Sequence, residues 1–389
     1  MDAHPREAFA CNAPLLASEK YLAWFRRHRF APEVGARGCS ISGPPDRSRS
    51  PENGTRGRLV MNAPRPKVSA VITAFNQESF VEMTIESVLS QTYRCDEIIV
   101  VDDGSSDATA ERVSAFGDAV ILIRQKNSGV AEARNAGVRR ASGDLIAFLD
   151  GDDIWAPGKI AVQVEAFKSF PASGLIAVDV WQFDERGTTW EGFLKQTIFE
   201  RSDERVRTGN WFDRLVEGHF ISTTSQVMVP KAVLYRVGSS DAKFPVSSDY
   251  DLYLRIAAHY DCVFINETLT GWRYVPTSVS GAADRRRFRW NEDCIRVLRK
   301  HTALASSSNR SRVRERSTRL LRQTISDAYY YGTDGNRLWA TRFLLGLAQR
   351  YGEPLPALYA LALWTPKSVR TVGKRLAAAA DAGAKNVLH

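Results

Sequence analysis

Three aspartates stand within four consecutive positions after an apolar segment of this chain. Residues 145–149 read Leu-Ile-Ala-Phe-Leu, and Asp150, Asp152 and Asp153 follow, with Gly151 after the first of them. A short apolar run with polar ends is typical of a buried strand. Carboxylates this close repel one another, and Mg²⁺ or Mn²⁺ is often held by one or two carboxylates plus substrate phosphates. The alternative is an acidic turn that caps a following helix.

Two more apolar runs end in polar residues. Residues 97–101 read Glu-Ile-Ile-Val-Val and precede Asp102 and Asp103, while residues 68–74 read Val-Ser-Ala-Val-Ile-Thr-Ala. Helical patterns occupy the intervening segments 78–91, 107–116 and 129–141. Strands that alternate with helices of this length predict an α/β fold with a mostly parallel, Rossmann-like sheet flanked by helices.

The carboxyl ends of parallel strands meet at one edge of a sheet, and ligands bind there in open α/β folds. Thr73, Asp103 and Asp152 each lie at such an end. We therefore expect these three side chains to share one rim, and a nucleotide site is favoured over three unrelated helix caps.

Five segments, in this order and spacing, resemble one known family. They read VSAVITAFN (68–76), SVLSQT (87–92), IVVDDGSSD (99–107), NSGVAEARNAG (127–137) and DGDDIW (150–155). Together they resemble the inverting family-2 glycosyltransferases, which have the GT-A fold. The resemblance is dense over residues 67–170 and thinner to about residue 280. It implies a GT-A domain over residues 67–280, with a nucleotide-binding half (67–155) and an acceptor half (156–280).

The resemblance also implies roles for residues on the donor side. Asp152 is expected to be the main ligand of a Mn²⁺ or Mg²⁺ cofactor, with Asp150 second, and Thr73 and Phe75 should hold the base and the ribose. Phe75 stands where Tyr is common in the family, so it can stack but cannot donate a hydroxyl.

Further donor roles follow from the same resemblance. Asp103 should read the uracil edge, and Arg134 should reach the base or a phosphate unless it is only a surface charge. Asp153 is expected to cap the helix near Pro157, and Arg273 resembles a late basic residue that helps to hold the diphosphate.

An inverting transfer needs a carboxylate that takes the proton of the acceptor hydroxyl. The resemblance points to Asp249, in the first turn of an amphipathic helix in which Leu252, Ile256 and Tyr260 recur every four residues. Family members commonly carry an acid pair there, but this chain has Ser248 as the first member. Asp251 is the alternative base. Asp249 could instead be a charge that the helix dipole favours.

The expected function is metal-dependent transfer of a sugar from a UDP-sugar to a glycan or a lipid-linked glycan in polysaccharide or cell-envelope biosynthesis. A polyprenyl-phosphate glycosyltransferase and a non-catalytic nucleotide-binding protein of the same fold are the alternatives. A dinucleotide oxidoreductase is disfavoured because residues 74–78, Ala-Phe-Asn-Gln-Glu, lack a G-x-G-x-x-G fingerprint.

Composition predicts a globular chain with terminal extensions. The 389 residues are 44% hydrophobic and 25% charged, and the five cysteines form no CxxC pair. No apolar run approaches the ~20 residues that span a bilayer, and no signal peptide is apparent, so a cytoplasmic protein is expected. Residues 32–66 are rich in Pro, Gly, Ser and Arg, and residues 1–66 are expected to be a disordered extension.

The net charge of +9 is unevenly distributed. Residues 281–389 carry 21 basic and 8 acidic side chains, and helices are expected over 284–302, 309–331, 336–350, 354–364 and 367–383. A basic helical region of this kind would suit peripheral contact with the inner face of an anionic cell membrane. The alternatives are solvated helix faces, or an apolar face that packs on the catalytic domain. Nucleic acid is not expected as a partner, because no recognised motif accompanies the charge.

Overall fold

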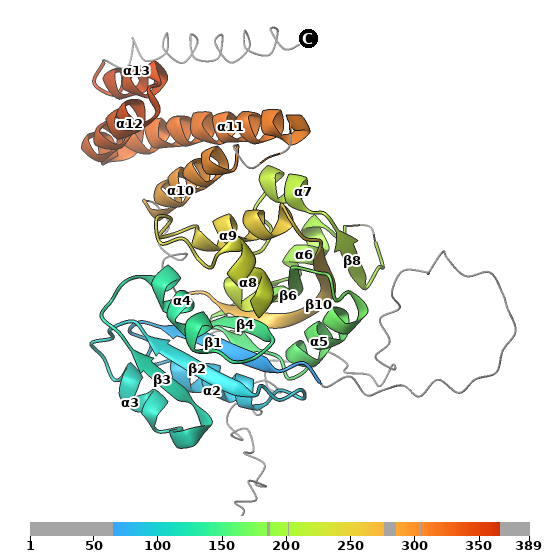
Figure 1. Cartoon of the computed structure of the whole chain (residues 1–389). Coiled ribbons are helices and arrows are strands. Elements are labelled where there is room, and N and C mark those ends of the chain that lie inside the picture. Colours follow the sequence, from blue (N-terminus) through green and yellow to red (C-terminus); the bar gives the residue numbers. More distant parts are fainter. Residues whose placement is uncertain are drawn as a thin grey trace, which may run out of the picture. The chain divides into compact units, whose positions relative to one another are not determined.

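The computed structural model describes residues 65–184, 187–200, 202–275, 285–302, 305 and 307–365. The chain divides into two compact units, Met1–Gly281 and Ala282–His389, and each is described by itself (Figure 1). The extension expected over residues 1–66 lies outside the described residues, apart from its last two. The helix expected over residues 367–383 also lies outside them.

Ten strands of the described residues form one sheet in the first unit. They are β1 (Val68–Ala74), β2 (Glu97–Asp102), β3 (Ile121–Arg124), β4 (Leu145–Asp150), β5 (Ile154–Trp155), β6 (Leu175–Asp184), β7 (Gly187–Glu191), β8 (Val206–Gly209), β9 (Val227–Pro230) and β10 (Cys262–Arg273). The order is β3-β2-β1-β4-β9-β6-β10-β5, with β7 beside β6 and β8 beside β10.

The direction of the strands differs between the two halves of the sheet. Strands β3, β2, β1 and β4 are all parallel. Strand β9 is antiparallel to β4 and β6, whereas β10 runs parallel to β6 and antiparallel to β5 and β8. The prediction of an α/β fold with a mostly parallel sheet flanked by helices is confirmed, and the parallel part is the half that the first three apolar runs build.

Helices connect these strands. They are α2 (Val81–Leu89), α3 (Thr109–Ser114), α4 (Val130–Arg140), α5 (Lys159–Ser169), α6 (Phe193–Thr197), α7 (Phe212–Glu217), α8 (Lys231–Val237) and α9 (Ser248–Ala257), with the 3₁₀ turns η1 (Gly117–Ala119) and η2 (Thr224–Gln226).

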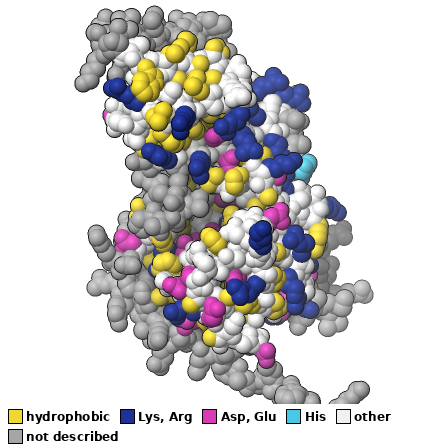
Figure 2. Space-filling view, turned by 90° about the vertical axis from the view of Figure 1, so that its left-hand side faces the viewer, with side chains coloured by type: hydrophobic (Ala, Val, Ile, Leu, Met, Phe, Trp, Pro, Cys, Tyr) yellow, Lys and Arg dark blue, Asp and Glu magenta, His cyan; other side chains and the backbone are white. Residues whose placement is uncertain are grey.

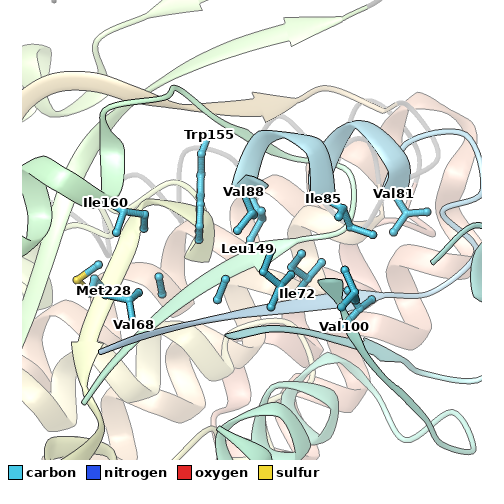
Figure 3. Close-up of a cluster of buried hydrophobic side chains, with 14 of the residues drawn as sticks. Val68, Ile72, Val81, Ile85, Val88, Val100, Leu149, Trp155, Ile160 and Met228 are labelled. Atoms are coloured by element: carbon cyan, nitrogen blue, oxygen red, sulfur yellow. The ribbon is translucent and has the colours of Figure 1, made fainter. Parts of the chain in front are cut away.

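Alternation along β1 sends its side chains to two different layers. Ile72 faces α2, where Ile85 and Val88 are buried in the cluster drawn in Figure 3. Each fully buried Val or Ile side chain contributes about 1.5–3 kcal/mol. On the opposite side α4 approaches so closely that a Cβ on Gly137 would overlap the Val71 side chain. The two layers therefore hold the carboxyl ends of the strands in place.

The strand register puts the polar ends on one rim. Thr73 on β1 pairs with Asp150 on β4, and Ala74 pairs with Asp102 on β2. All three strands are parallel, and nearly all of their residues are buried. The shared rim expected from the sequence is therefore present.

The second unit is helical in its described part. Its elements are α10 (Arg286–His301), α11 (Ser307–Tyr331), the π-helical segment η3 (Gly332–Asn336), α12 (Arg337–Tyr351) and α13 (Pro354–Ala362). Four of the five helices expected in this region are thus observed. Phe288, Ile325, Leu344 and Leu363 are among the buried residues of its own hydrophobic core. Among the described residues, no helix is both long and apolar enough to cross a membrane.

Candidate active site

The loops after β1 and β2 are joined by hydrogen bonds along the rim. Asn76 has a left-handed backbone with φ of 53°, a conformation that Asn tolerates better than most residues. Its N–H donates to the Ser105 hydroxyl at 2.9 Å, and its side-chain oxygen accepts from the Ser106 N–H at 2.9 Å. Phe75, just before this turn, is 46% exposed, so its ring is available for stacking.

Asp103 is buried and fastens the loop that precedes α4. Its carboxylate accepts from the backbone N–H groups of Ser128 at 2.9 Å and Gly129 at 2.8 Å, and from the Gln125 side chain at 2.8 Å. A carboxylate has about four acceptor positions, so about one remains for a ligand. This positioning role was not part of the sequence prediction.

Arg134 and Asp150 form a partly buried ion pair at the rim. Arg134 extends from α4, is 7% exposed, and donates from Nη2 to Asp150 Oδ1 at 2.8 Å. The Thr73 hydroxyl donates to the same oxygen at 3.4 Å. Arg134 is therefore not a surface charge.

The electrostatics of Arg134 connect it to a further carboxylate. Burial by itself would lower the pKa of Arg134, but the charges of Asp150 and Asp249 outweigh it, and the pKa is raised. The Nε–H of Arg134 is buried and has no hydrogen-bond partner among the described residues. An anionic ligand at the rim would satisfy this donor.

Gly151 lets the acidic turn lie against β1. Its N–H donates to the Thr73 carbonyl oxygen at 2.9 Å, and a Cβ at this position would lie 2.9 Å from the same oxygen. The adjacent Asp152 is half-buried. Burial, and then the negative charge of Asp150, raise the pKa of Asp152 to about 6. The turn thus holds a carboxylate that is costly to ionise without a compensating cation.

Asp153 is a buried connector, and the expectation that it caps a helix is wrong. Its carboxylate accepts from the hydroxyls of Thr223 at 2.9 Å and Ser225 at 2.6 Å, and from the Arg273 backbone N–H at 2.9 Å. It precedes β5, and α5 begins later, at Lys159, after Gly158. Asp153 therefore ties the acidic turn to η2 and β10 across the sheet.

Arg273, at the end of β10, is held behind the acidic turn. Its Nε–H donates to the Asp152 carbonyl oxygen at 2.8 Å. The guanidinium lies over the rings of Phe80 and Phe183, 4.7 and 4.4 Å from their centroids. Stacking of this kind fixes the plane of an arginine. The charge therefore stays beside Asp152, where it partly offsets the rise in the pKa of that carboxyl.

The first turn of α9 brings Asp249 to the same region. Asp249 is half-buried, and its Oδ1 accepts from the Tyr250 N–H at 2.8 Å. Its charge acts on Arg134 and on the half-buried His219. The pKa of His219 is lowered, because burial outweighs the opposing effect of the Asp249 charge. Tyr253, one turn further along α9, is fully buried, and its pKa is raised by burial and by Asp249. The structure thus brings a further carboxylate within electrostatic range of Arg134.

Asp251, the alternative base, is paired with an arginine of its own helix. It is buried and accepts from the Arg255 Nε–H at 2.9 Å. Arg255 also donates to the carbonyl oxygens of Val237 at 2.6 Å and Ser239 at 2.7 Å. Asp251 therefore anchors the loop before α9, and the same loop is held to α4 by paired 2.9 Å hydrogen bonds between Asn135 and Ser240.

A hollow in the first unit is lined by Gln182, Phe193, Ser222 and Trp272. Ser222 and Trp272 directly precede Thr223 and Arg273, two residues that donate hydrogen bonds to Asp153. An aromatic side chain and an amide in one hollow are suited to a polar ligand with an apolar face, such as a sugar ring.

Asp150 and Asp152 suit a hard cation only in combination with a ligand. Within the described residues, no three His, Cys, Asp or Glu side chains converge to hold a metal by themselves. Oxygen donors from one or two carboxylates are nevertheless the usual protein share of a Mg²⁺ site whose other ligands are phosphates and water. The raised pKa of Asp152 fits such a site, because the repulsion from Asp150 that raises it would be relieved by a cation.

Comparison with known proteins places this rim in a family. Residues 69–229 match the family model described as Glycosyl transferase family 2. The chain contains a family-2 glycosyltransferase domain. An uncharacterised glycosyltransferase of Rickettsia typhi is 26% identical over 211 residues, which cover 54% of this chain and 65% of that protein.

A second relative has a more specific name. UDP-Glc:alpha-D-GlcNAc-diphosphoundecaprenol beta-1,3-glucosyltransferase WfgD of Escherichia coli is 43% identical over 99 residues, which cover 25% of this chain and 39% of that protein. The chain thus spans less than two thirds of the length of these curated relatives. The crystal structure of S. aureus TarS 1-349 in complex with UDP-GlcNAc superimposes with a TM-score of 0.53 at 15% identity, covering 76% of this chain and 90% of that chain. This likeness concerns the fold.

The glycosyltransferase domain thus brings most of the expected residues together. Thr73, Asp150 and Arg134 share hydrogen bonds, and Asp152 and Asp249 act on them electrostatically. The sequence prediction missed the hydroxyl partners of Asp153. Their only signal is the run Ser-Thr-Thr-Ser at residues 222–225, about 70 residues downstream.

Proposed function

We propose that this protein transfers a sugar, with inversion, from a UDP-sugar to a lipid-linked glycan, and that Mn²⁺ or Mg²⁺ assists the transfer. The observation that carries the proposal is the charge arrangement at the rim. Arg134 donates to Asp150 of the acidic turn and also interacts electrostatically with Asp249, so one cationic group is close both to a carboxylate suited to the diphosphate side and to an acid that can accept a proton.

The donor side is expected to hold the nucleotide through the loops after β1 and β2. Phe75 offers an exposed ring for stacking on the base. The remaining acceptor position of Asp103 would take an N–H from uracil. Arg134, with its unsatisfied Nε–H, would donate to a phosphate oxygen.

The acceptor side supplies the proton acceptor. The acceptor hydroxyl attacks the anomeric carbon, the bond from that carbon to the diphosphate oxygen breaks, and Asp249 takes the hydroxyl proton. General-base assistance of this kind is typically worth ~10²–10⁴-fold in rate. Trp272 and Gln182, which line the hollow, would hold the acceptor sugar.

Asp152 and Asp150 would hold the cation. When bound, the cation supplies Lewis-acid stabilisation of the charge that develops on the leaving diphosphate. Arg273 contributes a fixed positive charge behind Asp152, which lowers the cost of two neighbouring carboxylates before the cation arrives.

A lipid-linked acceptor is proposed from the similarity to WfgD, whose name specifies a GlcNAc-diphosphoundecaprenol acceptor. The UDP-sugar donor is proposed from the same name and from the TarS complex with UDP-GlcNAc. A lipid-linked acceptor would require contact with a membrane, and the basic C-terminal region supplies charge for such contact.

The decisive experiment is a transfer assay with UDP-glucose or UDP-GlcNAc and a synthetic GlcNAc-diphosphate lipid, with Mn²⁺ or with EDTA. We expect product with the wild-type protein only when the cation is present. Asp249→Asn should abolish most turnover and leave donor binding intact, as measured by isothermal titration. Donor binding without transfer to any lipid-linked acceptor would instead indicate a nucleotide-binding protein.

A further inference from the structure

Helix α13 has one face in the core of its unit and another face in solvent. Leu363 and Ala360 are buried, whereas Leu358 and Leu361 are 60% and 67% exposed. Leu358 and Leu361 are three positions apart and so lie on the same side of the helix. No residue of α13 carries a charge. Only part of the apolar surface of α13 is therefore packed in the core of its unit.

The exposed side of α13 continues onto α12. The Trp364 indole N–H donates to the Thr341 hydroxyl at 2.8 Å, which places this 59%-exposed ring against α12. Leu338 and Leu345 precede and follow Thr341 by three and four positions, so they share its side of the helix. They are 59% and 48% exposed. Together these residues form what we call the α12–α13 face: Leu338, Leu345, Leu358, Leu361 and Trp364.

Basic side chains accompany this apolar face. Arg342 is exposed and lies between Leu338 and Leu345 on the same side of α12. Figure 2 shows hydrophobic side chains gathered over the C-terminal helices, with Lys and Arg side chains beside them. The sequence that follows Trp364 adds Lys367 and Arg370, and residues 281–389 as a whole carry 21 basic and 8 acidic side chains.

This combination has a specific chemical meaning. Clusters of large exposed apolar side chains are unusual on monomeric proteins and mark interaction surfaces. Leucines with a tryptophan whose N–H is already bonded suit the boundary between lipid headgroups and acyl chains, and flanking arginines are attracted to anionic headgroups. A face that joins both features fits a lipid surface that is apolar inside and negatively charged outside.

We propose that the α12–α13 face docks on an anionic membrane, with its leucines and Trp364 inserted among the lipids and Arg342 at the headgroups. The proposal rests on the proposed function, because it identifies the surface that would bring the enzyme to a lipid-linked acceptor. Vesicle binding is nevertheless measured without any donor or acceptor, so a failure to bind would be distinguishable from a failure of sugar transfer.

The test is co-sedimentation of the full chain with vesicles of phosphatidylglycerol and phosphatidylcholine, compared with vesicles of phosphatidylcholine alone. Wild-type protein should bind the anionic vesicles at low salt. At about 0.5 M salt, ions screen most of the charge attraction. Part of the binding should persist at that concentration, because the apolar side chains still enter the lipid. The Leu361→Gln/Trp364→Gln variant should partition at least about tenfold more weakly, because two large apolar side chains no longer enter the lipid.

Matched variants separate membrane insertion from other effects. Tyr235→Gln removes a 65%-exposed aromatic side chain from α8 of the first unit and should bind like wild type. Leu338→Gln/Leu345→Gln alters the same face on α12 and should repeat the loss if the first variant folds poorly. Circular dichroism and transfer to a short-chain soluble acceptor should be unchanged for both variants of the face.

Three results would overturn the proposal. One is absence of wild-type binding to anionic vesicles at low salt, and another is equal binding of wild type and both variants of the face. The third comes from sedimentation equilibrium. If wild type is a dimer and the Leu361→Gln/Trp364→Gln variant a monomer, the face joins two copies of the chain.

Discussion

Replacing Asp152 by Asn should stabilise the protein at pH 8 when no divalent cation is present. Burial and the charge of Asp150 raise the pKa of Asp152 from its ordinary value of 3.8 to about 6. The folded protein therefore binds more protons than the unfolded chain between about pH 4 and pH 6. It follows that the free energy of unfolding decreases as the pH rises through that window and stays lower above it.

The size of this effect follows from the two pKa values. At about 1.4 kcal/mol per pKa unit, the difference corresponds to about 3 kcal/mol as an upper limit. Solvent screens a half-buried carboxylate, so we expect a gain of about 1–3 kcal/mol for the Asn variant at pH 8. For a domain of this size, this is a rise in melting temperature of roughly 2–10 °C. At pH 4 the two proteins should melt at nearly the same temperature.

Differential scanning fluorimetry from pH 4 to pH 8, with EDTA present, measures the melting temperatures of wild type and the Asp152→Asn variant. The Asp118→Asn variant, which changes an exposed carboxylate, is the control. Adding Mn²⁺ with UDP should reverse the order at pH 8. Wild type would gain about 2.7 kcal/mol at a ligand concentration 100 times its dissociation constant, and the Asn variant would gain far less. If the Asp152→Asn variant melts at or below the wild-type temperature at pH 8 without metal, ionised Asp152 does not destabilise the folded protein, and the reasoning is refuted.

Three further changes test other parts of the site. Asp249→Asn should lower kcat by ~10²–10⁴-fold with unchanged affinity for UDP, and a normal kcat would move the base elsewhere. Asp153→Ala should lower the free energy of unfolding by about 2–4 kcal/mol in urea titrations, because it leaves the hydroxyls of Thr223 and Ser225 and the Arg273 N–H without their acceptor; a loss no larger than that of Asp118→Asn would contradict the connecting role. Gly151→Ala should weaken Mn²⁺-dependent UDP binding by at least about tenfold in titration calorimetry, since its Cβ would crowd the Thr73 carbonyl oxygen; unchanged affinity would show that the turn adapts.

Membership of the domain family and the position of the rim were predictable because they depend on local patterns. Each apolar run predicts a strand, and the helices between them require parallel neighbours, so Thr73 and Asp150 must end at one edge. The role expected for Asp249 came only from the resemblance, because its position in the first turn of a helix is equally common for an ordinary capping charge, and that role stays a prediction.

Strand periodicity and the order of the elements indicate which residues end the strands, because neither depends on distant contacts. The contacts of each carboxylate, in contrast, become known only when the chain is folded. Asp103, Asp153 and Asp251 resemble Asp150 and Asp152 as sequence letters. In the structure, however, Asp103 and Asp153 accept from residues of other segments, and Asp251 accepts from the half-buried Arg255. Likewise, periodicity indicated that α13 is apolar but not which side the core covers. Burial and hydrogen bonding depend on packing between segments that local sequence does not encode.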